Sequence, residues 1–503
     1  MSLGARLLPA VRAAGFVLAA ALLLLGLRAL AGWMVENHLR HEAGRELHAL
    51  QAGQPLWRWS LRQPRDLVAG RAFGNATVRG GATGLKVSSR DGKTFELGLP
   101  VMRPMDLAHW PQLWLVMRVS KAAQLSLVVQ PQAQAPACVA QTDAIPAGDA
   151  ATFVFDLRKL DWRHADSSAC ALPATVAYLF RLRVQLPAGE TLELREASLV
   201  AERPVRLPGA APTVDLSAGR EIDLLEQVTA APTMPAVPLV WLPRDGSVET
   251  WLQLRDRLHG LWPAAIVVPA GTVLTPMADD TGPAWVGWAV CAAYLLLMLY
   301  AARREIHPAW DVLLVAAGPL WLIAGLQWGL HASAPAATAF VAALVWAAWR
   351  EIRQRPADWH WLGGKTTDWL APLALLPVAG GLPILLGHGF AAPEWRHAFL
   401  YVGWAGLQQW LMLAVVLRRL QRWPGGSALP ILGAATLFAL LHVPNGALMQ
   451  LCFLAELWWA WCFLRSRRLL PIALAHAGCA LLVESGLSGA VLRSLEVSAR
   501  FFL

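Results

Sequence analysis

Polar side chains lie inside apolar runs in the C-terminal part of the chain. Gln408 and Gln409 occur in GWAGLQQWLML, His442 in LFALLHVPNG and His476 in PIALAHAGCALL. A fourth run, FLAELWWAW, contains Glu456. Ionisable groups at membrane depth are costly, and they mark candidate functional sites. Two histidines and one carboxylate are also the residue types of a zinc site that keeps one position open for water.

The same residues allow a purely structural interpretation. Glutamine and histidine side chains form hydrogen bonds between membrane helices, and each contributes about 0.6 kcal/mol or somewhat more. On this interpretation the polar groups only cross-link three helices. The cysteines of the apolar runs have no ligand spacing and are expected to be small core residues; they are Cys291, Cys452, Cys462 and Cys479.

The apolar runs predict membrane-spanning helices. Of the 503 residues, 56% are hydrophobic and 15% are charged, which is typical of a membrane protein with a soluble part. Arginines gather in alternate loops, and the positive-inside rule then makes the N-terminus cytoplasmic. The net charge of +9 therefore reflects topology rather than a nucleic-acid partner. The nine runs are 13–35, 284–302, 310–330, 332–349, 369–388, 398–417, 428–443, 446–464 and 469–492.

The first apolar run is predicted to be a retained membrane anchor. Arg6 and Arg12 precede its Leu-Ala core, and Ala29-Leu30-Ala31 resembles a cleavage site, so a cleaved signal peptide is the alternative. The run continues to Val35 and is long enough to span a membrane, which favours the anchor. Both interpretations export the domain that follows.

The exported region is predicted to be an antiparallel β-sandwich. Short alternating segments follow one another between residues 56 and 200, separated by Gly, Pro, Asn and Asp. The stretches FDLRKLDW and LRVQLPAGETLELREASLV resemble the later strands of galactose-binding-like jelly rolls, many of which hold carbohydrate. The resemblance implies a jelly-roll-like fold with a glycan or a protein as its partner.

The tryptophans and cysteines of this region allow specific predictions. Tryptophans can stack on sugar rings, but a Trp in a strand usually fills the core, and core positions are expected for Trp57, Trp59, Trp110 and Trp162. Cys138 and Cys170 are the only cysteines outside the apolar runs, and an oxidising compartment favours a disulfide between them.

Four regions follow from these patterns. The N-terminal membrane anchor or signal covers 1–36, and the extracytoplasmic, galactose-binding-like β-sandwich covers 50–203. A small α/β connecting region covers 204–283, where residues 238–270 predict strand, helix and strand. The transmembrane helical domain covers 284–503.

The order and spacing of the polar residues resemble the CAAX protease and bacteriocin-processing family, also called the Abi family, of intramembrane proteases. The family pattern is EExxxR, then FxxxH about thirty residues later, then HxxxN or HxxxD. Phe438 and His442 match FxxxH, and RSRRLLPIALAHAG, with His476, is similar to the segment leading into the last motif. Gln408 and Gln409 stand where the paired glutamates would be. The resemblance implies an all-α, eight-helix bundle in a bacterial inner membrane, with the β-sandwich in the periplasm.

The departures from the family pattern affect the expected chemistry. The chain has no Glu-Glu dipeptide, and Leu413 and Ala480 occupy the family's Arg and final Asn or Asp positions. In the family the first glutamate activates the attacking water, whereas glutamine cannot accept a proton at neutral pH. Loss of a general base lowers a rate by roughly 10² to 10⁴. Glu456, together with His442 and His476, is the candidate replacement site, with zinc or another divalent metal as its cofactor.

Two functions are therefore predicted. The first is an intramembrane endopeptidase-like protein that acts on membrane-associated or exported peptide, with impaired catalysis. The second is a non-catalytic membrane receptor or scaffold, whose exported sandwich binds a glycan or a protein while the bundle holds a membrane partner. The glutamines at the first motif favour the second function, and the family resemblance favours the first. A transporter is disfavoured because the sequence shows no convincing internal repeat.

Overall fold

The computed structural model contains two compact units. One comprises residues 1–36, 247–249 and 280–503, and the other comprises 37–246 and 250–279. They are called the membrane unit and the β-rich unit below. The structure describes residues 3–503 except 133, 171, 173–175, 204, 206–212, 216–236, 245, 279–281, 354–357, 387, 392–394, 424–425 and 490–491.

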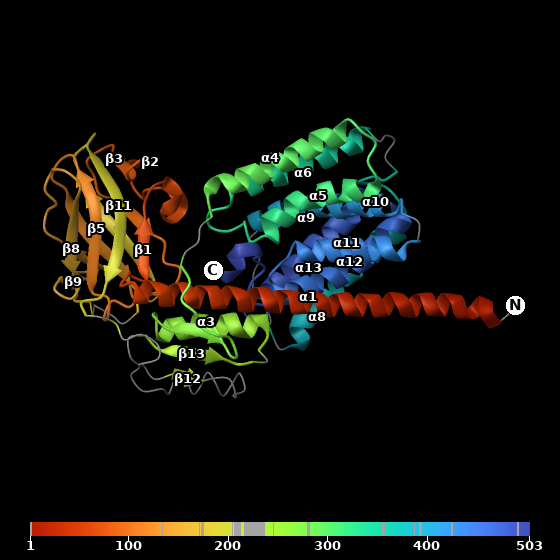
Figure 1. The fold of residues 1–503 in the computed structure, drawn as a ribbon, viewed down its shortest axis with the longest axis horizontal. Coiled ribbons are helices and arrows are strands. Elements are labelled where there is room, and N and C mark those ends of the chain that lie inside the picture. The colour runs from red at the N-terminus through yellow and green to blue at the C-terminus, as the bar shows by residue number, and fades with distance from the viewer. Residues whose placement is uncertain are drawn as a thin grey trace. The chain divides into compact units, whose positions relative to one another are not determined.

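Every apolar run of the sequence contains at least one helix in the described part of the chain (Figure 1). Helix α1 (Leu3–Gln51) is longer than the run 13–35 that it contains. The others are α4 (Ala284–Ala302), α5 (Pro308–Ile323), α6 (Ala334–Arg353), α7 (Thr366–Leu373), α8 (Leu375–Leu385), α9 (Trp395–Gln409), the π-helical η3 (Trp410–Leu417), α10 (Arg418–Leu420), α11 (Ala428–Leu440), α12 (Gly446–Ser466) and α13 (Leu470–Leu487).

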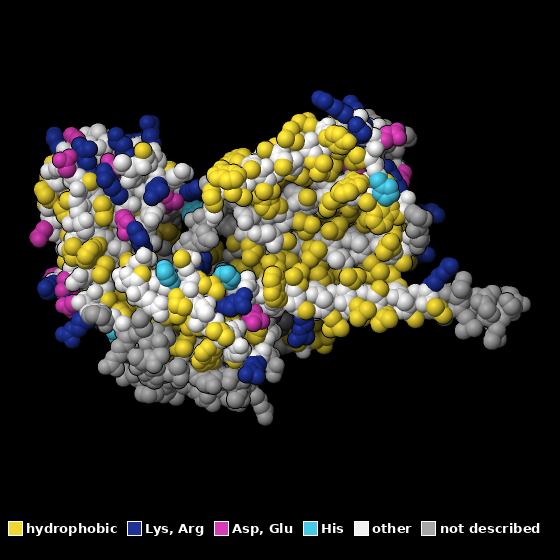
Figure 2. Space-filling view, viewed as in Figure 1, with side chains coloured by type: hydrophobic (Ala, Val, Ile, Leu, Met, Phe, Trp, Pro, Cys, Tyr) yellow, Lys and Arg dark blue, Asp and Glu magenta, His cyan; other side chains and the backbone are white. Residues whose placement is uncertain are grey.

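Within the described residues, six helical segments are long and apolar enough to cross a membrane. They are Val11–Gln51, Trp285–Ala302, Thr366–Leu385, Trp395–Leu420, Gly446–Ser466 and Leu470–Leu487. The apolar helices α5 and α11 are shorter. Hydrophobic side chains cover the visible face of α4 and its neighbours in Figure 2, and α4 exposes Trp285, Leu296 and Leu299. These features fit a multi-pass membrane protein, while the eight-helix count remains a prediction.

Proline and asparagine set the helix ends around His442. Helix α11 ends at Leu440, two residues before the histidine and not after it as the sequence suggests. Pro444 lacks an amide proton and cannot continue the helix. Asn445 then caps α12, because its side-chain oxygen accepts a hydrogen bond of 3.2 Å from the Leu448 amide. His442 is thereby held in the turn between α11 and α12.

The β-rich unit has two antiparallel sheets. Their strand orders are β2-β3-β11-β5-β8, where β1 also pairs with β11, and β4-β10-β6-β7-β9. The strands are β1 (Trp57–Ser60), β2 (Ala76–Gly80), β3 (Leu85–Ser89), β4 (Phe95–Leu99), β5 (Gln112–Val119), β6 (Gln124–Gln130), β7 (Cys138–Gln141), β8 (Ala151–Asp156), β9 (Trp162–Arg163), β10 (Leu179–Gln185) and β11 (Thr191–Val200). The galactose-binding-like jelly roll remains a prediction.

One continuous core joins the two sheets. Strand β5 alternates buried and more exposed residues, which turns one of its faces to the core. Strand β11 pairs with β3 along its first half and with β1 along its second, on the same edge. The expected core positions of the tryptophans are confirmed, with exposures of 8% or less at Trp57, Trp59, Trp110 and Trp162.

A small parallel sheet follows in the chain. Its order is β12 (Thr213–Asp215), β13 (Leu239–Leu242) and β14 (Ile266–Pro269), and α3 (Val248–Leu261) connects the last two strands. This agrees with the strand, helix and strand predicted for 238–270. Residue His259 of α3 is buried, and its Nε2 lies 3.1 Å from the Ala265 carbonyl oxygen.

Candidate intramembrane active site

Three helices bring one buried polar group each to a common point in the membrane unit. Gln409 is the last residue of α9, Glu456 lies within α12, and His476 lies within α13. The Gln409 Nε2 donates a hydrogen bond of 2.9 Å to Glu456 Oε2 and lies 3.3 Å from His476 Nδ1. Gln409 and Glu456 are fully buried, and His476 is 5% exposed. One amide group thus connects a carboxylate to an imidazole.

His442 approaches the same region from the turn after α11. Its Nδ1 lies 2.8 Å from the Phe438 carbonyl oxygen, one helical turn earlier. The Phe438 ring packs edge-on against both histidines, with centroid distances of 4.8 Å to His442 and 5.4 Å to His476. The FxxxH spacing therefore supplies both a hydrogen-bond acceptor and an aromatic spacer between the two imidazoles.

A cavity of about 560 Å³ meets these side chains. His442, His476 and Gln408 line its wall, which is otherwise mostly apolar, whereas Gln409 and Glu456 lie behind the wall. Among the described residues, three buried oxygens at or behind the wall have no hydrogen-bond donor: Gln408 Oε1, Gln409 Oε1 and Glu456 Oε1. Because unsatisfied buried acceptors are costly, they indicate room for a donor supplied by water or by a ligand.

The predicted site residues are placed as follows. Gln409, Glu456 and His476 come together, His442 and Gln408 lie on the cavity wall, and Ala480 also lines the cavity. Leu413, at the family's arginine position, is buried in the π-helical segment η3 and supplies no charge. Glu484 lies apart from this group and makes an ion contact of 3.4 Å with His397 at the partly exposed end of α13.

Two aromatic residues of the site escaped the sequence analysis. Tyr401 and Trp459 line the cavity and pack against His476, with centroid distances of 6.3 Å and 5.2 Å. Helical spacing could have indicated Tyr401, because it precedes Gln408 by seven residues. Seven residues are about two helical turns, so the two side chains lie on one helix face. Trp459 follows Glu456 by three residues on α12, also a same-face spacing.

The residues present do not fit the metal site expected from the sequence. Within the described residues, a group of three potential ligand atoms lying within 4.8 Å of one another occurs at Cys138, His164 and Cys170 in the β-rich unit. Glu456, His442 and His476 do not form such a group, because Gln409 stands between the carboxylate and His476. The geometry supports proton transfer and hydrogen bonding by the side chains themselves.

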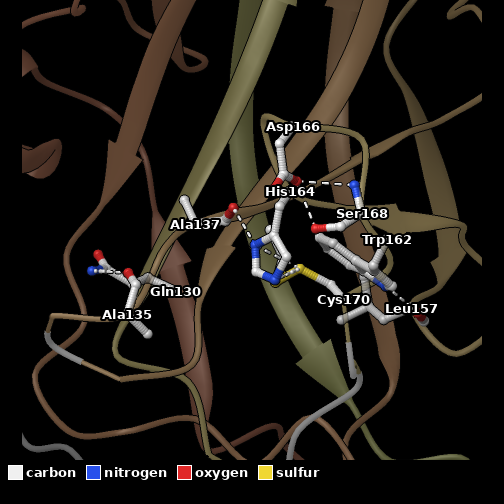
Figure 3. Close-up of a disulfide and its surroundings, with 10 residues drawn as sticks. Gln130, Ala135, Ala137, Leu157, Trp162, His164, Asp166, Ser168 and Cys170 are labelled. Atoms are coloured by element: carbon white, nitrogen blue, oxygen red, sulfur yellow. Dashed lines mark hydrogen bonds between the residues drawn. A yellow bond between two sulfur atoms is a disulfide. The ribbon is translucent and has the colours of Figure 1, made fainter.

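The β-rich unit has its own polar features, but they are paired. Cys138 and Cys170 form a disulfide in the structure (Figure 3). His109 Nδ1 lies 2.7 Å from Asp106 Oδ2, and this hydrogen bond raises the pKa of His109. Burial alone would raise the pKa of Glu96, yet hydrogen bonds from Arg183 and Arg181 outweigh it and lower that pKa.

Comparison with known proteins gives one family match and six matching chains among the solved structures, of which two are described below. No curated protein matches the chain. A family 11 carbohydrate-binding module from Clostridium thermocellum, solved with a beta-1,3-1,4-mixed-linked tetrasaccharide, is 13% identical, with a TM-score of 0.20. The match covers 26% of this chain and 86% of that chain. A solution structure of CtCBM11 gives the same identity, coverage and TM-score.

The family match falls on the candidate site. Residues 391–482 match the family described as Type II CAAX prenyl endopeptidase Rce1-like. That segment contains all of the polar residues placed around the cavity, from Gln408 to His476. The match confirms the resemblance found in the sequence, because these residues are similar to the prenyl endopeptidase members of the CAAX protease and bacteriocin-processing family.

Proposed function

We propose that the membrane unit is an intramembrane endopeptidase-like hydrolase that acts on membrane-associated or exported peptide. Its chemistry rests on His442 and His476, with Glu456 and Gln409 as positioning residues. The observation that carries this proposal is the position of Gln409 Nε2, between Glu456 Oε2 and His476 Nδ1. That contact sets the protonation pattern of His476, and the contact of His442 with the Phe438 carbonyl sets a different pattern on the second histidine of the cavity wall.

The carboxylate orients the amide, and the amide orients His476. The Oε2 atom of Glu456 accepts a hydrogen bond of 2.9 Å from Gln409 Nε2, so the NH₂ group of Gln409 faces Glu456. The second hydrogen of that NH₂ group is then available to His476 Nδ1, which acts as the acceptor. A neutral imidazole whose Nδ1 accepts carries its proton on Nε2. His476 is therefore a hydrogen-bond donor, suited to stabilise the negative oxygen that forms when a peptide carbonyl is attacked.

His442 has the opposite assignment. Its Nδ1 faces the Phe438 carbonyl oxygen at 2.8 Å, and a carbonyl oxygen only accepts, so Nδ1 carries the proton. Nε2 of His442 then has a lone pair and is suited to accept a proton from water. Both rings line the same cavity, so the cavity has one base and one donor. This pair replaces the general base that the first motif lost at Gln408.

The reaction follows from these two roles. Water attacks the scissile carbonyl carbon while His442 takes the proton of that water, and His476 donates a hydrogen bond to the carbonyl oxygen as it becomes negative. The C–N bond then breaks, and the protonated His442 returns the proton to the leaving amine. Gln409 and Glu456 remain behind the wall and keep His476 in one tautomer throughout.

The wider setting is part of the same proposal. The chain would lie in a bacterial inner membrane as a multi-pass protein, with a cytoplasmic N-terminus and the β-rich unit in the periplasm. The six long apolar helices and the family match support the membrane setting. In this arrangement the β-rich unit would meet the exported part of a substrate, or a glycan or protein partner.

A non-catalytic receptor or scaffold is the second candidate, and one observation favours it. None of the described residues that line the cavity is Asp or Glu. On this alternative the polar groups serve helix association, and the cavity holds a membrane partner without cleaving it. The two candidates differ in whether any product forms.

The deciding experiment uses the full chain in lipid vesicles with a library of membrane-anchored peptides, followed by mass spectrometry of the products. The hydrolase proposal predicts cleavage that His442→Ala and His476→Ala each reduce by roughly 10² to 10⁴. The control is Cys291→Ser, a buried substitution in α4 away from the cavity wall, which should cleave normally. Absence of cleavage by a folded native chain would reject the hydrolase and favour the scaffold.

The positioning role of Glu456 needs a separate readout. Glu456→Gln should lower kcat with little change in KM, because the substituted side chain can hydrogen-bond to Gln409 in either amide orientation and no longer fixes the His476 tautomer. Nitrogen-15 NMR of histidine-labelled protein should show His476 protonated on Nε2 in the native chain and in mixed tautomers in the variant. An unchanged tautomer signal together with normal kcat would contradict the role.

A further inference from the structure

The β-rich unit contains a second group of chemistry-bearing side chains, which the proposed hydrolase does not use. Cys138 begins β7, and Cys170 and His164 lie on the hairpin that follows β9. Potential ligand atoms of the three residues lie within 4.8 Å of one another. Both ring nitrogens of His164 are 3.2 Å from Cys170 Sγ. Figure 3 shows the imidazole of His164 beside the sulfur of Cys170.

We infer that Cys138, Cys170 and His164 form a thiol-dependent metal site, which takes one Zn²⁺ when the disulfide is reduced. Two thiolates and one imidazole are ligands that Zn²⁺ prefers, and three protein ligands leave a fourth position open for water. The two thiolate charges also balance the charge of the ion. A second histidine or a carboxylate is not needed for this set.

The hydrogen bonding of His164 matches that of a metal ligand. Its Nδ1 lies 3.3 Å from the Ala137 carbonyl oxygen, which can only accept. With the proton on Nδ1, Nε2 carries the lone pair that a metal ion would need, and it lies 3.2 Å from Cys170 Sγ. Histidine ligands of metals usually donate their other ring N–H to a carbonyl or carboxylate in this way, which fixes the ring orientation.

Hydrogen bonds independent of the disulfide hold the hairpin. The Cys170 amide donates to the Trp162 carbonyl at 2.9 Å, and the His164 amide donates to the Ser168 carbonyl at 2.9 Å. Asp166 accepts from the Ser168 amide at 2.9 Å and from its hydroxyl at 2.6 Å. Trp162 Nε1 donates to Leu157 at 2.8 Å. Opening the S–S bond therefore leaves the three ligands on a framework that is already in place.

Electrons and protons balance when the disulfide form is converted into the zinc-bound form. A dithiol reduces the disulfide: the S–S bond accepts two electrons and two protons to give two thiols, and the dithiol becomes a disulfide. Binding of Zn²⁺ then releases two protons as the thiols become thiolates. Cys138 is 2% exposed, whereas Cys170 and His164 are half-buried, so dithiol and metal both arrive from the Cys170 side. Either the disulfide or the metal links β7 to the hairpin.

The test titrates the full-length protein in detergent with Zn²⁺ and with Co²⁺, before and after reduction by a phosphine. The reduced protein should bind one equivalent and show thiolate-to-cobalt charge-transfer absorption, while the oxidised protein should show none. His164→Ala should weaken Zn²⁺ binding by at least about 100-fold, the upper end of the loss typical for an outer hydrogen-bond partner of a ligand. This variant keeps both cysteines, so its disulfide and fold can be verified first.

Matched controls separate this site from the other thiols and histidines. Cys291→Ser and His109→Ala remove a buried cysteine of the membrane unit and a second histidine of the β-rich unit, and neither should change Zn²⁺ affinity. Binding that persists in His164→Ala, or equal binding by oxidised and reduced protein, would overturn the inference. Loss of the β-sheet circular dichroism signal on reduction would overturn it too, because the framework would then depend on the disulfide.

Discussion

The two units treat buried polar groups differently. In the β-rich unit, Glu96 receives hydrogen bonds from both Arg181 and Arg183, at 3.0 Å and 2.7 Å. In the membrane unit, Glu456 has one hydrogen bond, from Gln409, and its second oxygen has no donor among the described residues. Both oxygens of Glu96 are paired with arginines, and a role in stability is enough to explain that arrangement. A fully buried carboxylate with an open acceptor indicates a function.

The membrane unit also contains a buried ion pair of the structural kind. Asp311 Oδ2 lies 3.0 Å from Arg419 Nε, and Asp311 Oδ1 accepts from Trp346 Nε1 at 3.0 Å. Asp311 and Arg419 are each 1% exposed. Burial alone therefore does not distinguish the candidate site. The distinguishing feature is the cavity, which His442 and His476 line and which neither Asp311 nor Arg419 lines.

The largest effect is expected from the histidines. His442→Ala and His476→Ala should each reduce peptide cleavage by roughly 10² to 10⁴, and the double variant should lose little more than the worse single variant, because the two rings act as one unit. Rates on a single cleaved peptide in vesicles provide the measurement. Strictly multiplicative losses would mean that the two imidazoles act independently, and the contrast between the units would weaken.

The buried ion pair should produce the largest stability effect. Asp311→Asn removes the carboxylate that pairs with both Arg419 and Arg350 and should cost about 3 to 5 kcal/mol in the free energy of unfolding. Thermal unfolding in detergent would report this as a lower Tm, compared with Arg500→Ala, which breaks the half-exposed 2.8 Å pair with Glu496. If Asp311→Asn lowers the Tm no more than Arg500→Ala does, the buried pair contributes no more to stability than a surface pair.

The acid sensitivity of the β-rich unit should depend on His259. Burial lowers the pKa of His259 to about 3, and Arg103 adds to this shift. Between about pH 6.5 and 3 the unfolded chain binds a proton that the folded chain does not, so stability falls by up to about 1.4 kcal/mol per pH unit on acidification. In His259→Gln, the unfolding free energy measured with denaturant should change less with pH across this range.

His109 is a control for His259, because its pKa is shifted in the opposite direction. The hydrogen bond from Asp106 raises the pKa of His109, so its stabilisation is complete below about pH 6.5 and is lost as the pH rises through the folded-state value. His109→Gln should therefore change stability below pH 6.5 and not at alkaline pH. The same acid slope in His259→Gln as in the native chain would show that other groups cause the acid loss.

The smallest effect is expected at a surface pair of the β-rich unit. Arg58 and Glu196 face each other across β1 and β11, with two hydrogen bonds of 2.8 Å and 2.9 Å. Because Arg58 is about half exposed, Arg58→Ala should cost about 0.2 to 1 kcal/mol in unfolding free energy. Urea unfolding at low and high salt provides the measurement. A loss above about 2 kcal/mol would contradict the view that surface pairing contributes little here.

The sequence by itself determined the local features. Nine apolar runs became helices because helix formation in an apolar segment depends on nearby residues, and a hydrogen-bonded helix satisfies the backbone within the membrane. The FxxxH spacing places Phe438 and His442 four residues apart, close enough for their rings to pack although His442 lies in the turn beyond the end of α11. The family resemblance also came from short motifs that can be seen without a fold.

Only the tertiary structure decided the chemistry. Glu456 is 47 residues from Gln409 and His476 is 67 residues from it, and no local rule fixes which side chains meet when α9, α12 and α13 pack. The orientation of the Gln409 amide depends on the carboxylate beside it, and the tautomer of His476 depends on that amide. The position of His164 beside two cysteines also depends on how β7 pairs with β9. These contacts arise from packing between distant segments, which sequence spacing does not encode.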